Sequence, residues 1–140
     1  LKGDVVLKKS NFQLIGKPKI TKIIFISNKD FVFDKEVSLK ISNNVQIAKS
    51  MDQQKRESIV TLSFGIFSGE NLSEVPFKID LEIEGCFIWD EELEKNSRLD
   101  NLLKQNAPAI LYSYLRPIIT LITIEANMPP LVIPLLNFSE

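Results

Sequence analysis

The 140-residue sequence contains no histidine, and Cys86 is its only cysteine. Within one chain these absences exclude metal clusters held by His or by Cys and His, haem ligated by histidine, and nucleophilic systems that need a histidine base. They also exclude an intramolecular disulfide framework, so we expect a reducing, cytoplasmic setting. The sequence predicts no cofactor, no metal and no catalytic residue, and we do not expect an enzyme.

A large charge of one sign is also missing, because the formal net charge is −1. Residues 1–60 carry 12 Lys and Arg against 6 Asp and Glu, whereas residues 70–94 carry one Lys against nine acids. The lysines of the first half are spread out, with few aromatic residues between them. This pattern favours solvated strand faces over a surface for nucleic acid. The first eight residues are too short and too charged for a signal peptide.

Hydrophobic residues make up 44% of the chain, which is typical of a folded domain. A chain of this length buries enough surface for one core without disulfide or metal staples. We therefore expect residues 1–140 to form a single domain.

Four segments alternate apolar and polar residues with the period of two that a half-buried strand requires. Short segments rich in Ser, Asn, Asp and Gly separate them, which favours an antiparallel meander. A proline at position 18 interrupts the first segment and fits an edge strand or a bulge. The expected strands cover residues 12–26, 36–48, 57–67 and 77–89.

The period changes after residue 90, where Leu99, Leu102 and Leu103 share one face of a predicted helix over 91–106. Asn96-Ser97 could break this helix or cap its second half, and Asn106 could cap a second helix that runs to about residue 126. The fold class is thus α+β: a four-stranded antiparallel β-meander followed by two helices and an extended, Pro-rich C-terminal segment.

Charge is nearly absent from residues 107–139, where only Arg116 and Glu125 are charged. A helix that is apolar around most of its circumference must be buried on several sides, span a membrane, or leave an apolar surface for a partner. An arginine at mid-depth of a membrane costs about 2.5–3.5 kcal/mol on insertion scales. We therefore expect no membrane insertion.

Residues 128–138 contain three prolines, which forbid a helix and disfavour a central strand. The segment is strongly apolar, yet it cannot satisfy its backbone in regular structure. Two interpretations stay open. The segment is either a C-terminal strap that closes the core or one wall of an apolar groove for extended polypeptide.

These C-terminal residues resemble those of SecB-type export chaperones. Residues 106–116, Asn-Ala-Pro-Ala-Ile-Leu-Tyr-Ser-Tyr-Leu-Arg, match the family pattern P-x-I-L-[FY]-x-Y-x-R, and residues 128–138 match its P-P-L-x-[LI] loop and N-F close. Weaker similarity covers the rest of the chain, including Gly85 to Trp89 at the end of the fourth expected strand.

The resemblance implies a homotetramer built as a dimer of dimers. It also implies an ATP-independent holdase that binds unfolded or preprotein polypeptides in an apolar groove and serves protein export. Carried over by position or by place beside the matched segment, the expected polypeptide-binding residues are Phe87, Trp89, Tyr112, Met128, Pro129, Pro130, Leu131, Val132 and Ile133.

The family docks a translocation motor on an acidic sheet face, and Asp80, Glu82 and Glu84 could form a small face of this kind. The net charge of only −1 departs from the strongly acidic family pattern and weakens that expectation. Two alternatives stay open. One is a chaperone dedicated to one partner, such as an antitoxin. The other is a non-chaperone adaptor whose apolar C-terminal half is consumed in contacts between its own copies.

Overall fold

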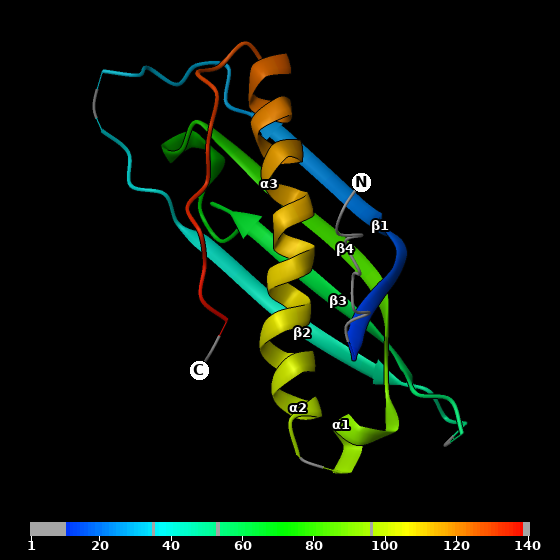
Figure 1. The fold of residues 1–140 in the computed structure, drawn as a ribbon. Helices are drawn as coiled ribbons and strands as arrows, with labels where there is room; N and C mark the ends of the chain where they lie inside the picture. Colours follow the sequence, from blue (N-terminus) through cyan, green and yellow to red (C-terminus); the bar gives the residue numbers. More distant parts are fainter. Residues whose placement is uncertain (1–10, 35, 53, 96, 139–140) are drawn as a thin grey trace, which may run out of the picture.

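The computed structural model describes residues 11–34, 36–52, 54–95 and 97–138. Its four strands form one antiparallel sheet, and helical segments follow them in the chain (Figure 1). This arrangement confirms the predicted α+β class with a four-stranded antiparallel sheet. The strands are β1 (Phe12–Ser27), β2 (Ile41–Lys49), β3 (Glu57–Ile66) and β4 (Phe77–Trp89), with a 3-10 turn, η1 (Leu72–Glu74), before β4.

The strand order is β1-β4-β3-β2, so the expected simple meander is wrong for the first strand. Strands β2, β3 and β4 follow one another as neighbours, but β1 pairs with β4. Hydrophobic alternation gives each strand its inner and outer face and does not specify its neighbour. The side-chain amide of Asn28 donates to the carbonyls of Leu72 (2.9 Å) and Val75 (3.0 Å), which fixes the exit of β1 beside the turn before β4.

Strand β1 lies at an edge of the sheet, and its pairing with β4 is interrupted between Ile15 and Lys19. Gly16 in this interruption has a φ of 65°, a conformation that glycine adopts without a steric penalty. The irregularity that Pro18 predicted is therefore confirmed, and it lies on an edge strand as expected.

Strand β2 begins later than predicted, at Ile41 instead of residue 36. Strand β3 ends at Ile66 because Phe67 turns into the left-handed region (φ 57°), and the amide of Phe67 donates to the carbonyl of Lys40 (2.9 Å). Residues before Lys40 thus have no strand to pair with. Residues 28–34 and 36–40, here called the β1–β2 loop, cross from one edge of the sheet to the other (Figure 1).

The helical region is divided near residue 97, as predicted, and not at Asn106. Helix α1 (Glu91–Lys95) is short, and Ser97 has a φ of 61°, whereas Asn96 lies outside the described residues. From Leu99 to Glu125 the chain is helical without interruption. Asn106 has helical backbone angles and makes no side-chain cap, so the prediction of a new helix start there is wrong. The helical segments are α2 (Leu99–Asn101), a π-helical turn η2 (Leu102–Asn106) and α3 (Ala107–Glu125).

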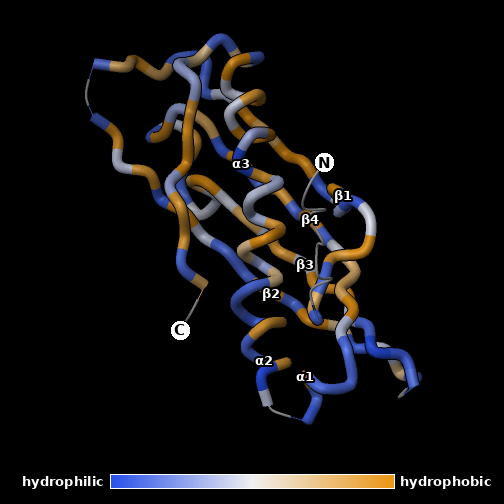
Figure 2. The backbone as a smooth tube through the Cα atoms, in the orientation of Figure 1, coloured by the Kyte–Doolittle hydropathy of each residue, from blue (hydrophilic) through white to orange (hydrophobic). Residues whose placement is uncertain are grey.

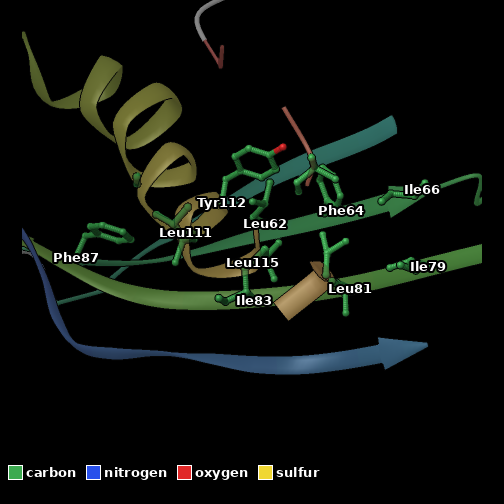
Figure 3. Packing of buried hydrophobic residues seen from close by; sticks show 14 of the residues in the cluster. Leu62, Phe64, Ile66, Ile79, Leu81, Ile83, Phe87, Leu111, Tyr112 and Leu115 are labelled. Carbon is green, nitrogen blue, oxygen red and sulfur yellow. The ribbon is translucent and has the colours of Figure 1, made fainter. Parts of the chain in front are cut away.

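Helix α3 lies across one face of the sheet, and the core fills the space between them (Figures 1 and 3). Leu111 and Leu115 are fully buried against the inner side chains of β3 and β4. A Cβ on Gly85 would lie 2.7 Å from Leu14 Cδ1 and 3.0 Å from Leu111 Cδ2, so a glycine here makes room for the helix. The stretch Leu99–Glu125 is long and apolar enough to cross a membrane, yet here it supplies the core.

Candidate functional site

The C-terminal segment of residues 127–138, here called the strap, turns back and runs beside α3 (Figure 1). The reversal is made by Asn127 in the left-handed region (φ 59°), and the amide of Met128 donates to the carbonyl of Thr123 (3.0 Å). The strap has no regular secondary structure, in agreement with the prediction from its prolines. Its backbone must therefore be satisfied by other groups.

Two hydroxyl groups of α3 hold the backbone of Leu131. The Leu131 amide donates to Thr123 Oγ1 (3.0 Å), and the Leu131 carbonyl accepts from Thr120 Oγ1 (2.7 Å). The Thr123 side chain is 1% exposed and also donates to the carbonyl of Thr120 (2.8 Å). Helix side chains thus bond the strap much as a neighbouring strand would.

The same helix face holds the strap further along. Arg116 donates to the carbonyl of Ile133 from both Nε (3.1 Å) and Nη2 (3.0 Å). The Tyr112 hydroxyl donates to the carbonyl of Pro134, and its ring lies 5.3 Å from that of Phe64. Burial raises the pKa of Tyr112, and the charge of Arg116 partly opposes this rise. The phenol therefore stays a neutral donor at physiological pH.

An apolar pocket of about 240 Å³ lies between the strap and the β1–β2 loop. The rings of Phe67 and Phe77 meet edge to face at its base, with centroids 5.5 Å apart. Nearly all of its wall is hydrophobic, so it can bury an apolar side chain but cannot activate a reacting group. The lining residues are Phe33, Val37, Leu39, Phe67, Pro76, Phe77, Thr123, Met128, Pro129 and Leu131.

The β1–β2 loop is anchored at its end by an ion pair between Lys40 and Glu70. The hydrogen bond and the charge of Glu70 together raise the pKa of Lys40. Between this anchor and Asn28, Val32 and Phe33 are 66% and 59% exposed. Of these two, Phe33 lines the apolar pocket, and a large apolar side chain in solvent at the rim of such a pocket is typical of a binding surface.

Three of the predicted binding residues line this pocket: Met128, Pro129 and Leu131. Pro130 and Val132 are exposed on the strap and do not line it. The Ile133 side chain is 1% exposed and belongs to the core. Part of the strap thus closes the core, as one of the two interpretations expected, and other strap residues border an apolar pocket. Polypeptide binding at this pocket stays a prediction.

The three predicted aromatic residues lie in the core and away from the pocket. Phe87 is fully buried and stacks on Phe12 at 5.3 Å, Tyr112 is 2% exposed, and Trp89 is 9% exposed. The Trp89 indole donates to Glu94 Oε1 (3.0 Å), which ties α1 to the end of β4. These side chains shape the scaffold, and Figure 3 shows Phe87 and Tyr112 within the cluster between α3 and the sheet.

The sequence did not single out the opposite wall of the pocket. Phe33 stood outside every predicted strand, and Val37 and Leu39 fell in the predicted second strand. A signal was present, because residues 31–39 hold five large apolar residues among turn and charged residues. Only the crossing of the β1–β2 loop brings them opposite the strap.

The acidic residues Asp80, Glu82 and Glu84 lie on the sheet face opposite α3, where β1 supplies partners for two of them. Lys19 Nζ is 3.4 Å from Glu84 Oε1, and Thr21 Oγ1 donates to Glu82 Oε1 at 2.8 Å. Lys19 thus neutralises part of the negative charge of Asp80, Glu82 and Glu84, and this reduces the negative potential that the three residues present to a partner.

Comparison with solved structures defines the class of fold. The chain superposes on a SecB-like chaperone of Mycobacterium tuberculosis, solved in complex with an antitoxin peptide, with a TM-score of 0.67 and 14% identity. The match covers 91% of this chain and 88% of that one. A protein of unknown function from Streptococcus agalactiae matches with a TM-score of 0.50 and 14% identity, covering 89% of this chain and 99% of that one. The fold is that of SecB-like chaperones.

Sequence comparison identifies the family. The profile described as "Preprotein translocase subunit SecB" matches residues 24–140, so the chain belongs to the SecB family of chaperones. An uncharacterized protein of Methanocaldococcus jannaschii is 27% identical over 118 residues, which cover 82% of this chain and 72% of that protein. The protein-export protein SecB of Anaplasma phagocytophilum is 37% identical over 62 residues, 41% of this chain and 39% of that protein.

Proposed function

We propose that this protein is an ATP-independent holdase that binds unfolded or preprotein polypeptides in the groove between the strap and the β1–β2 loop. The observation that carries the proposal is the apolar pocket between two exposed segments that lack regular secondary structure. Its aromatic base and its walls of Phe33, Val37 and Leu131 fit side chains that a folded client would hide. Membership of the SecB family supports the same conclusion.

Such binding needs no catalytic group, because its free energy comes from burying apolar surface. One large apolar side chain contributes about 1.5–3 kcal/mol, which gives only weak affinity alone. Several such contacts along one extended client add up while each tolerates many sequences. Binding the unfolded state selectively then holds the client unfolded by mass action.

The proposal places the protein in the cytoplasm as a homo-oligomer, either a dimer or a dimer of dimers. The oligomer is proposed because a single chain leaves apolar surface outside the groove uncovered. Leu121 and Ile124 on α3 are 56% and 47% exposed. Figure 2 shows hydrophobic residues along this helix and along β1. A role in export would add a motor protein docking at Asp80, Glu82 and Glu84, a site that the ion pair with Lys19 weakens.

A second candidate function is dedication to a single partner such as an antitoxin. The observation that favours it is the match to a SecB-like chaperone whose own structure contains an antitoxin peptide. A dedicated chaperone would bind one sequence far better than unrelated unfolded chains, which a comparison of clients measures directly.

The groove is tested by Phe33→Asp, which places a charge at the exposed rim of the pocket. We expect at least a tenfold loss of affinity for a permanently unfolded client, because a buried apolar contact is lost and a carboxylate must be desolvated. Binding of reduced, carboxymethylated α-lactalbumin, followed by fluorescence anisotropy, measures the loss. Suppression of aggregation at one chain per client should fall in parallel.

The matched control is Met51→Asp, because Met51 is 98% exposed and lies beyond the opposite end of β2. This variant should bind the client as the wild type does. Equal binding by the Phe33 variant would remove the groove assignment. A wild-type protein that ignores unfolded clients and hydrophobic dyes would favour the adaptor alternative.

A further inference from the structure

Strand β2 lies at the edge of the sheet farthest from β1, and its outer side faces no other strand of the described residues (Figure 1). It pairs with β3 in one continuous register and contains no proline. The β1 edge differs, because its register shifts where Gly16 and Pro18 lie. A regular edge strand without such interruptions is the kind to which another strand can be added.

The hydrogen bonds at the two ends of β2 show which of its backbone groups point outward. The amide of Phe67 donates to the carbonyl of Lys40 (2.9 Å), and the amide of Ser50 donates to the carbonyl of Glu57 (3.2 Å). In an antiparallel pair, residues that bond the partner strand alternate with residues that do not. The even-numbered residues therefore bond β3, and the odd-numbered ones direct their amides and carbonyls to the free edge. These outward residues are Ile41, Asn43, Val45, Ile47 and Lys49.

The side chains of β2 give the free edge an apolar side and a polar side. Ile41, Val45 and Ile47 are partly buried and pack against the core beneath the helix. The residues between them point to the opposite face of the sheet and are Ser42, Asn44 and Gln46. Side chains directly opposite each other on paired strands share a face. A strand added to this edge thus fits best when its apolar and polar residues alternate.

The free edge begins where the loop wall of the apolar pocket ends. Val37 and Leu39 line the pocket, and the chain enters β2 at Ile41. An unfolded chain with one side chain in the pocket can therefore continue along β2. Lys49 is the only charged residue of this strand, so the edge itself does not select the client by charge.

We propose that an unfolded client adds to the β2 edge as an antiparallel strand, and that this edge selects segments in which apolar and polar residues alternate. The inference rests on the proposed holdase function and specifies its substrate class. Main-chain bonds give affinity for any extended sequence, while alternate side chains provide the selection. Such segments are those that form strands in the folded client, and exposed strands are prone to associate with one another.

The substrate class is tested with two fluorescein-labelled twelve-residue peptides of identical composition. In one peptide Leu and Val alternate with Ser and Thr, and in the other the same residues follow the helical period. We expect the wild-type protein to bind the alternating peptide about three- to tenfold more tightly, as measured by fluorescence anisotropy. Equal affinities would contradict the selection of alternating segments.

The pairing itself is tested with N-methylated forms of the alternating peptide, which leave the protein unchanged. In an antiparallel added strand, the client residues opposite the outward residues of β2 carry the apolar side chains and turn their amides toward β2. Methylation of the amides at the apolar positions should therefore weaken binding at least about tenfold, and methylation at the polar positions should change it by less than about twofold. Equal effects of the two sets, or the reverse order, would overturn the proposal.

The matched variants are Asn43→Pro and Asn43→Ala, because Asn43 has an exposed side chain and an outward amide. Proline removes that amide at an edge position where proline is tolerated, whereas alanine keeps it. We expect the proline variant to bind the alternating peptide about three- to tenfold more weakly and the alanine variant to bind it within about twofold of the wild type.

The remaining outcomes separate the alternatives. A proline variant that binds the peptide normally but assembles to a lower mass would assign the β2 edge to a second copy and overturn the proposal. A wild type that binds the peptides but is insensitive to methylation would refute strand addition alone. A wild type that binds neither the peptides nor carboxymethylated α-lactalbumin would refute the holdase function itself.

Discussion

Arg116 is one of two charged residues in the last quarter of the chain before Glu140, and the structure gives it a specific partner. Its guanidinium is directed at the carbonyl of Ile133, which a Pro-rich strap cannot satisfy through a sheet ladder. The matching arginine in the family pattern is thus explained in this chain by backbone satisfaction. This charge, in an otherwise apolar region, holds in place the strap that forms one wall of the apolar pocket.

Replacing this arginine tests that role at the scale of one residue. Arg116→Met keeps the apolar stem and removes both hydrogen bonds, so we expect the free energy of unfolding to fall by about 1.5–3 kcal/mol. Urea denaturation measures the change. Lys104→Met is the control, because Lys104 is an exposed cation on the π-helical turn and should shift stability by less than about 0.5 kcal/mol. Equal effects from both variants would contradict the assigned role.

At the scale of elements, the position of α3 on the sheet depends on a glycine of β4. Gly85 lies on the inner face, where its missing Cβ leaves room for Leu14 and Leu111. A branched side chain there would push the helix away from the strand. The turns between strands are less demanding, since a Cβ on Gly69 meets no atom within 4 Å.

Gly85→Val should therefore destabilise the protein by about 1–3 kcal/mol through overpacking, whereas Gly69→Val should change stability little. The midpoint of thermal unfolding, followed by circular dichroism, compares the two variants. A Gly85 variant as stable as the wild type would show that α3 has freedom to shift at this contact.

At the scale of the whole molecule, the core is incomplete at the β1 edge. Ile23 lies opposite Leu81 and so faces the helix-covered side of the sheet, yet it is 54% exposed. Other inner residues of β1, such as Ile20 and Phe25, pack against the core, so the uncovered part of this edge is at Ile23. An apolar edge strand with unpaired backbone groups associates readily with another chain, and a second copy is the partner that the proposal requires.

We expect the purified protein to be a dimer or a tetramer by light scattering. Ile23→Asp should lower the assembled mass, because a charge there would be buried between copies without a partner. Met51→Asp, far more exposed and outside this edge, should leave the mass unchanged. A monomeric wild type would contradict this expectation.

The sequence predicted well those features of the secondary structure that depend on residues adjacent in the chain. The alternation over residues 77–89 placed β4 at its observed bounds, and Pro18 marked the irregular edge strand. The break near Ser97 and the irregular strap also followed from local backbone preferences. The start of β2 could not be predicted in this way, because pairing with β3 decides it. The continuity of the helix through Asn106 could not be predicted either, because the packing of α3 decides it.

By itself, then, the sequence determined the class of elements, the inner faces of β2, β3 and β4 and the family, since these follow from periodicity and from a contiguous motif. Only the tertiary structure decided that β1 pairs with β4 and that Phe87 and Tyr112 are buried. The tertiary structure alone also brings Phe33 to face Leu131 across the pocket. The physical reason is that periodicity records which side of an element is apolar, whereas the choice of what covers that side depends on contacts between distant segments.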